Sequence, residues 1–88
     1  MREFPFLQEA VGVTMEELRR DRRMTKLALA DFSGLQDSYI RSIAKGRKRP
    51  SIIVLYSLAE AFGIGPVDFL ARIEKTRQRL IEEDRAKK

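Results

Sequence analysis

Four basic residues stand close together near the middle of the chain, and their side chains carry the chemistry that binds phosphate groups. They are Lys45, Arg47, Lys48 and Arg49. Between Arg19 and Arg49 the sequence has ten basic and three acidic residues, whereas the remainder has eight basic and ten acidic residues. A basic centre between nearly neutral ends is typical of a surface that binds a polyanion. The alternative, that these charges only face solvent, is weaker, because the basic run borders a stretch whose residue spacing predicts a defined structural motif.

The stretch before the basic run carries side chains that can read the edges of bases. Residues 36–45 form a predicted helix in which Ile40 and Ile43, three residues apart, face a core. The opposite face then presents Asp37, Ser38, Arg41, Ser42 and Lys45. Serine hydroxyls both donate and accept hydrogen bonds, and an arginine can donate two to guanine O6 and N7. Ser38, Arg41 and Ser42 are therefore candidate base-reading residues.

Other residues of this region each have two possible roles. Asp37 could accept a hydrogen bond from cytosine N4, which adds it to the base-reading candidates, but we favour an electrostatic role at the helix N-terminus. Tyr39 could pack in the core or contact a phosphate through its hydroxyl. Arg22 and Arg23 could reach the same face or close the C-terminus of the first helix. The predicted phosphate-binding residues are Lys26, Tyr39, Lys45, Arg47, Lys48 and Arg49, with one or two of the loop charges expected to be only solvated.

Positioning these side chains requires two helices joined by a tight turn. Ala30 is small enough to let helices over residues 25–33 and 36–45 cross at close range, and Gly34 tolerates the positive φ of a turn. This arrangement is a helix-turn-helix, which lays its second helix in the DNA major groove.

A first helix is predicted to end near Arg23, and its start is open. Either Gly12 is tolerated inside the helix, or Thr14 and Glu17 form a capping box that starts a shorter helix at Met15. A fourth helix is predicted between a Ser51 cap and Gly63. A fifth begins at Pro66 and continues to about residue 83, ahead of a frayed end. The expected fold class is therefore all-α.

The fourth and fifth helices carry more apolar residues than one small core is expected to bury. The fourth is predicted to turn inward Ile52, Leu55, Leu58, Ala59 and Phe62. Some of Ile53, Val54 and Tyr56 should then face outward, and exposed apolar groups of this kind are typical of a surface that binds another protein. The fifth has a seam made of Phe69, Ile73, Thr76 and Leu80. We interpret the outward residues of the fourth helix together with Phe69, Ile73 and Leu80 of the seam as a homodimer surface. The alternative is that the fifth helix folds back over the outward residues of the fourth helix within one chain.

The composition argues against several other classes of function. With neither cysteine nor histidine, the chain lacks a thiol nucleophile, the commonest general base and the usual zinc ligands. No paired acidic motif suggests a catalytic site, so we expect no enzyme, no metal and no cofactor. No apolar run approaches a membrane span, and the N-terminal residues lack the features of a signal peptide. The expected location is the cytoplasm.

Six segments resemble the Cro/repressor-type (Xre) helix-turn-helix regulators. They are VG at 11–12, LRRDRRMT at 18–25, LA at 29–30, GLQDSYIRSI at 34–43, GRKRPS at 46–51 and LAEAFGI at 58–64. The resemblance implies a five-helix lambda-repressor-like fold, here with an extended C-terminal helix. It also implies a dimer that binds operator DNA and represses or activates transcription. We expect one domain over residues 1–88, with a helix-turn-helix core over 11–70 and an extension over about 66–83.

Two positions depart from the family pattern. Where the family usually has a glutamine that contacts a phosphate, this chain has Lys26, which keeps phosphate binding but makes it sensitive to salt. Where it often has a buried glutamate, this chain has Ala44. Arg19, at the position of that glutamate's partner, must either turn outward to a phosphate or pair locally.

These observations predict a sequence-specific regulator that binds double-stranded DNA. We expect a homodimeric repressor that reads a palindromic operator, with one helix over residues 36–45 in the major groove of each half-site. The half-sites would lie about 34 Å apart. A DNA-binding antitoxin and a restriction–modification controller fit the same features. The alternative from another class is a protein-interaction module built on this fold.

Overall fold

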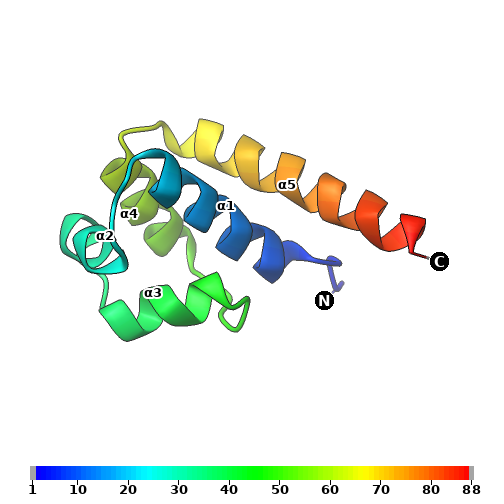
Figure 1. The fold of residues 1–88 in the computed structure, drawn as a ribbon, viewed down its shortest axis with the longest axis horizontal. Coiled ribbons are helices and arrows are strands. Elements are labelled where there is room, and N and C mark those ends of the chain that lie inside the picture. The colour runs from blue at the N-terminus through cyan, green and yellow to red at the C-terminus, as the bar shows by residue number, and fades with distance from the viewer. Residues whose placement is uncertain (1, 88) are drawn as a thin grey trace.

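Five helices and no strand make up the part of the chain that the structure, a computed structural model, describes, residues 2–87 (Figure 1). The helices are α1 (Leu7–Asp21), α2 (Lys26–Ser33), α3 (Asp37–Ala44), α4 (Ile52–Phe62) and α5 (Pro66–Ala86). The all-α prediction is confirmed.

The ends of α2 and α4 follow from local capping chemistry. The hydroxyl of Thr25 accepts a hydrogen bond from the backbone N–H of Ala28 at 3.0 Å, and that of Ser51 accepts one from Val54 at 3.2 Å. Gly34 and Gly63 end the two helices in the left-handed region, with φ of 74° and 70°. These residues satisfy backbone groups that a helix end leaves unpaired, so the predicted boundaries of both helices are confirmed.

The two outer helices differ from the prediction at their ends. α1 begins at Leu7 and therefore contains Gly12, so the shorter helix with a capping box is wrong. It ends at Asp21, before Arg23, which adopts a positive φ of 53°. The expected fraying of residues 84–88 is also wrong as far as Ala86, because α5 continues to that residue. Residue 88 lies outside the described residues.

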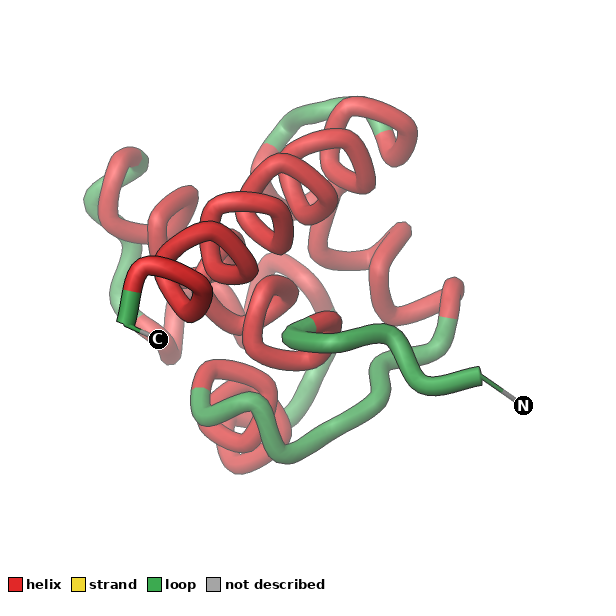
Figure 2. Tube along the Cα trace, turned by 90° about the vertical axis from the view of Figure 1, so that its right-hand side faces the viewer, coloured by secondary structure: helices red, strands yellow, loops and turns green. Residues whose placement is uncertain are grey.

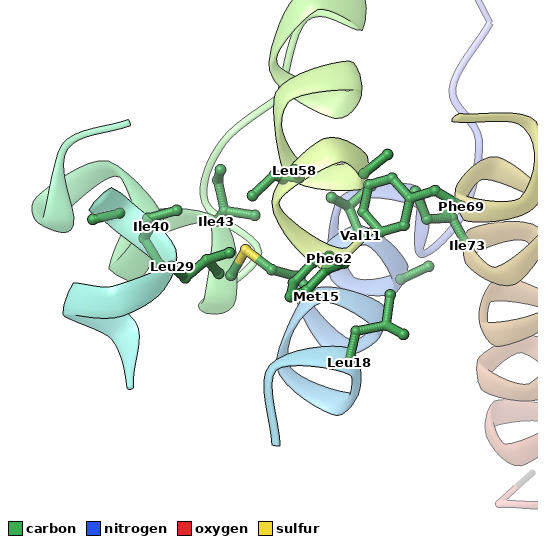
Figure 3. Close-up of a cluster of buried hydrophobic side chains, with 13 residues drawn as sticks. Val11, Met15, Leu18, Leu29, Ile40, Ile43, Leu58, Phe62, Phe69 and Ile73 are labelled. Carbon is green, nitrogen blue, oxygen red and sulfur yellow. The ribbon is translucent and has the colours of Figure 1, made fainter. Parts of the chain in front are cut away.

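The core is built where all five helices meet (Figure 3). Its largest members are Met15, Leu18, Leu29, Ile40, Ile43, Leu58, Phe62, Phe69 and Ile73. The predicted inward residues Ile40 and Ile43 are buried, which holds α3 in one rotation about its axis. Ile52 is the exception among the residues predicted to point inward from α4, because its position in the first turn leaves it 68% exposed.

α5 packs along α1 rather than projecting from the domain (Figure 1). Phe69 and Ile73 are each 1% exposed, and Leu80 packs partly buried against the same core. The hydroxyl of Thr14 on α1 donates a hydrogen bond to the hydroxyl of Thr76 at 2.8 Å, in a buried contact. The predicted dimer seam on α5 is therefore wrong, because its residues are used inside the protomer. The fifth helix does fold back, but onto α1, which leaves Ile53 exposed.

Gly12 lies where α1 crosses the C-terminal end of α3. A Cβ atom on this residue would collide with the main-chain oxygen of Ile43 and lie 3.0 Å from that of Ala44. The absence of a side chain therefore sets how closely α3 approaches α1.

Among the residues described, none of the helices is by itself both long enough and apolar enough to cross a membrane. α4 and α5 taken as a pair, bent by 102°, meet that criterion of length and composition.

Candidate nucleic-acid interface

α3 lies at the edge of the molecule, on the side away from α5 (Figure 1). Because Ile40 and Ile43 are buried, the side chains on the opposite face point outward. Ser38 and Arg41 are exposed and Ser42 is half-buried. The three residues that we predicted to read bases are thus brought together on one helix.

Asp37 and Arg41 form an ion pair one turn apart on α3. Oδ2 of Asp37 lies 2.9 Å from Nη2 of Arg41. The other carboxylate oxygen, Oδ1, is buried without a hydrogen-bond partner among the residues described. Asp37 is the first residue of the helix, where a negative charge is stabilised by the helix dipole.

The basic loop, residues 45–49, is tied to the end of α3 by its own backbone. Gly46 has a φ of 71°, and its N–H donates to the carbonyl of Ile43 at 2.9 Å. The N–H of Arg47 donates to the carbonyl of Ser42 at 3.0 Å. The exposed residues Lys45, Arg47, Lys48 and Arg49 therefore lie next to the polar face of α3. Tyr39 packs partly buried against the core.

A second group of charges surrounds the start of α2. The carboxylate of Glu16 accepts hydrogen bonds from Nε and Nη2 of Arg19 at 2.8 and 3.1 Å, and Nζ of Lys26 lies 3.4 Å from it. Nη1 of Arg19 also donates to the carbonyl of Met24 at 2.6 Å. Arg19 therefore pairs locally, which decides between the two alternatives for this residue. The hydrogen bond from Arg19 lowers the pKa of Glu16, so its carboxylate stays charged and holds Lys26 beside the N-terminus of α2.

Arg22 is the C-cap residue of α1, and its side chain reaches the end of α4. Its Nε donates to the carbonyl of Phe62 at 2.7 Å, and its guanidinium lies 5.7 Å from the centre of the Phe62 ring. Because the two residues are 40 positions apart, nothing local in the sequence could have indicated the contact.

The N-terminal segment runs beside the loop between α3 and α4 (Figure 2). This segment and the first turn of α1 bring acidic side chains to the basic loop, a contact that the sequence pattern did not predict. Oε1 of Glu3 lies 4.0 Å from Nη2 of Arg49. A Cβ atom on Gly46 would lie 3.4 Å from Cγ of Glu9, so Glu9 is in contact range of the loop. Screening by solvent makes the exposed Glu3 pair weak.

A groove with apolar walls lies between α4 and α5. Its exposed walls, which we call the α4/α5 apolar surface, are Ile52, Tyr56, Val67 and Leu70. Ile53 is exposed beside it, whereas Val54 is half-buried and packs against the core. Two of the three residues predicted to face outward from α4 do so, and Ile52 joins them. The sequence pattern did not single out Val67, because the predicted seam lies on the buried side of α5.

Comparison with known proteins identifies similar chains. Residues 15–69 match the family model described as Helix-turn-helix. An uncharacterized HTH-type transcriptional regulator, y4dJ, of Sinorhizobium fredii (strain NBRC 101917 / NGR234) is 31% identical over 70 residues, which are 80% of this chain and 91% of the relative. The clp gene regulator ClgR from Corynebacterium glutamicum is 30% identical, with a TM-score of 0.80 over 94% of this chain and 89% of that one. The restriction-modification controller protein C.AhdI from Aeromonas hydrophila is 29% identical, with a TM-score of 0.68 over 70% of this chain and 94% of that one.

Proposed function

The chain belongs to the Xre/Cro-type helix-turn-helix family of DNA-binding transcriptional regulators, and on this premise we propose that it is a homodimeric repressor of a palindromic operator. The observation that carries the proposal is the polar face of α3, held outward by buried Ile40 and Ile43 with the basic loop at its end. A helix presented in this way fits the major groove of duplex DNA. Such a regulator acts where the DNA is, so we place it in the cytoplasm.

The side chains divide between reading bases and binding phosphates. Ser38, Arg41 and Ser42 lie along α3 and would contact base edges. The phosphate contacts would come from Lys26 beside the start of α2 and from Lys45, Arg47, Lys48 and Arg49 in the loop, with the Tyr39 hydroxyl as a further donor. These contacts contribute affinity without sequence information.

A second copy of the chain is the occupant we propose for the α4/α5 apolar surface. A two-fold dimer brings the same surface of each copy together, so Tyr56 and Leu70 would be shielded by their own counterparts. Exposed apolar groups clustered in this way are typical of an interaction surface. The two-fold axis would also present two α3 helices to two half-sites about 34 Å apart, which is the spacing of one helical turn.

Selecting bound sequences from a pool of random duplexes tests the function directly. The expected result is a palindromic site with half-sites one helical turn apart. Recovery of no preferred sequence would contradict the proposal.

The salt dependence of binding separates this function from the protein-interaction alternative. For the selected duplex, the logarithm of the association constant should fall steeply with the logarithm of salt concentration, because bound phosphates release counterions. Replacing exposed Lys48 with alanine should weaken binding to all duplexes alike and reduce the slope by about one. A flat salt dependence would favour the protein-interaction module instead.

A further inference from the structure

Asp37 and Arg41 are placed so that one can control what the other reads. We propose that Asp37 is a specificity-determining residue that touches no base itself but positions the guanidinium of Arg41 for a single guanine. The inference rests on the proposed function, since it needs α3 to lie in the major groove. It differs from a direct contact between Asp37 and cytosine, and from a purely electrostatic role at the helix N-terminus.

The carboxylate is a fixed point rather than a mobile surface charge. The side chain of Asp37 is 29% exposed, whereas that of Arg41 is 62% exposed. One oxygen of Asp37 is buried, so the carboxylate can meet an external partner mainly through Oδ2, the atom that faces Arg41. Its negative charge in the first turn of α3 also interacts favourably with the helix dipole.

The arginine gains order from this contact and keeps its capacity to bind a base. An exposed arginine samples many rotamers and loses that freedom when it binds, which weakens the contact. The ion pair, at 2.9 Å between Oδ2 and Nη2, removes part of this freedom before DNA arrives. A guanidinium has five N–H donors, so a carboxylate that engages one terminal nitrogen leaves enough donors for guanine O6 and N7.

The contact has a chemical consequence for the choice of base. A guanidinium held in one orientation donates well only to a base that offers two acceptors at that place, which in the major groove is guanine. A guanidinium released from Asp37 could turn toward phosphates, which occur at every sequence. The contact with Asp37 therefore lowers the affinity of Arg41 for DNA of any sequence and raises its preference for guanine at one base pair.

The test is a double-mutant cycle on the full chain. Binding is measured for the selected duplex, for the same duplex changed at one base pair at a time, and for an unrelated duplex. Arg41→Ala identifies the base pair that Arg41 reads. Asp37→Asn should then reduce the preference at that same base pair about tenfold, a large part of what a bidentate arginine contributes. In the Arg41→Ala background, Asp37→Asn should leave every base preference unchanged.

Asp31→Asn is the matched control, because Asp31 is an exposed carboxylate on the neighbouring helix α2 and its loss changes the net charge equally. It should raise affinity for all duplexes alike. Each preference is a ratio of two affinities of one variant, so partial loss of folded protein cancels.

Two results would overturn the positioning role. One is that Asp37→Asn shifts base preference no more than Asp31→Asn does. The other is that it still shifts preference without Arg41, which would mean that Asp37 reads a base itself. If the unaltered protein shows no preferred DNA sequence, both the proposed function and the positioning role are wrong. If it shows a preferred sequence but the double-mutant cycle gives one of these two results, only the positioning role is wrong.

Discussion

Glu16 joins the charges at the start of α2 into one group. Nε of Arg19 lies 2.8 Å from its carboxylate, Nζ of Lys26 lies 3.4 Å away, and Nη2 of Arg20 lies 4.0 Å away. This chain has Ala44 at the position where the sequence resemblance implies a buried glutamate in many family members. Glu16, on α1 itself, is the carboxylate that pairs with Arg19, so the Arg19 side chain is bound within the protomer. Lys26 remains the cation at the start of α2.

Because of this group of charges, the free energy of unfolding should decrease at acid pH. The hydrogen bond from Arg19 lowers the pKa of Glu16 below its ordinary value of 4.5 in the folded protein. The resulting stabilisation is fully present above pH 4.5 and is lost as the pH falls through the lowered pKa. Glu16→Gln should therefore cost about 1–2 kcal/mol of unfolding free energy at pH 7, and the difference from the parent should shrink toward pH 2.5.

Urea unfolding at the two pH values measures this difference. Glu60→Gln, a change at an exposed carboxylate on α4, serves as the control and should alter stability little at either pH. An equal cost of Glu16→Gln at both pH values would contradict the assigned cause.

At the scale of elements, the crossing of α1 and α3 decides where the face that we propose to read bases lies. Periodicity predicted both helices, but Gly12 could only be described as tolerable, because its role depends on a backbone that passes close to it from residues 43–44. The ends of α2 and α4 were predictable, since Thr25 and Ser51 cap them with local hydrogen bonds. The end of α5 was predicted too early, at about residue 83, whereas the helix continues to Ala86. The ion pair between Arg85 and Glu82 at 3.1 Å lies in these last turns and is local in the sequence.

Gly12→Ala should therefore destabilise the protein although it replaces a helix residue of low propensity. Alanine gains about 1 kcal/mol in an ordinary helix. Here its Cβ meets the main-chain oxygens of Ile43 and Ala44, so α1 and α3 must separate. We expect a net loss of about 2 kcal/mol, as is typical of overpacking, together with weaker DNA binding.

Thermal and urea unfolding measure the loss. Gly65→Ala is the matched control, because the nearest atom to its Cβ would be Oδ2 of Asp68 at an ordinary 3.6 Å. If both changes are equally mild, the close crossing does not matter for stability.

At the scale of the whole molecule, the fold divides apolar residues between a core and one open surface. Ile73 is buried against α1, so lysine at this position would unfold the protomer and could not report on dimers. Tyr56 and Leu70 are 56% and 55% exposed and belong to the α4/α5 apolar surface. They are the residues at which association can be tested without opening the core.

Tyr56→Glu together with Leu70→Lys should convert the proposed dimer into a folded monomer. The expected result is half the mass by sedimentation with unchanged helix content, because both side chains lie outside the core. The control is Leu27→Lys, at an exposed apolar residue on α2 that does not line this surface, which should leave the mass unchanged. An unchanged mass for the double variant would exclude this surface as the dimer interface.

The sequence by itself determined the features that depend on neighbours along the chain. Helix period placed Ile40 and Ile43 inward and Ser38 and Arg41 outward, and capping residues set the ends of α2 and α4. Only the tertiary structure decided which apolar faces pack together. The helical period of apolar residues shows that one face of a helix must be buried, but it does not show which other helix, or which other chain, buries it. The stripe containing Phe69 and Ile73 could have served a second chain, and its burial against α1 within the same chain left a different surface open.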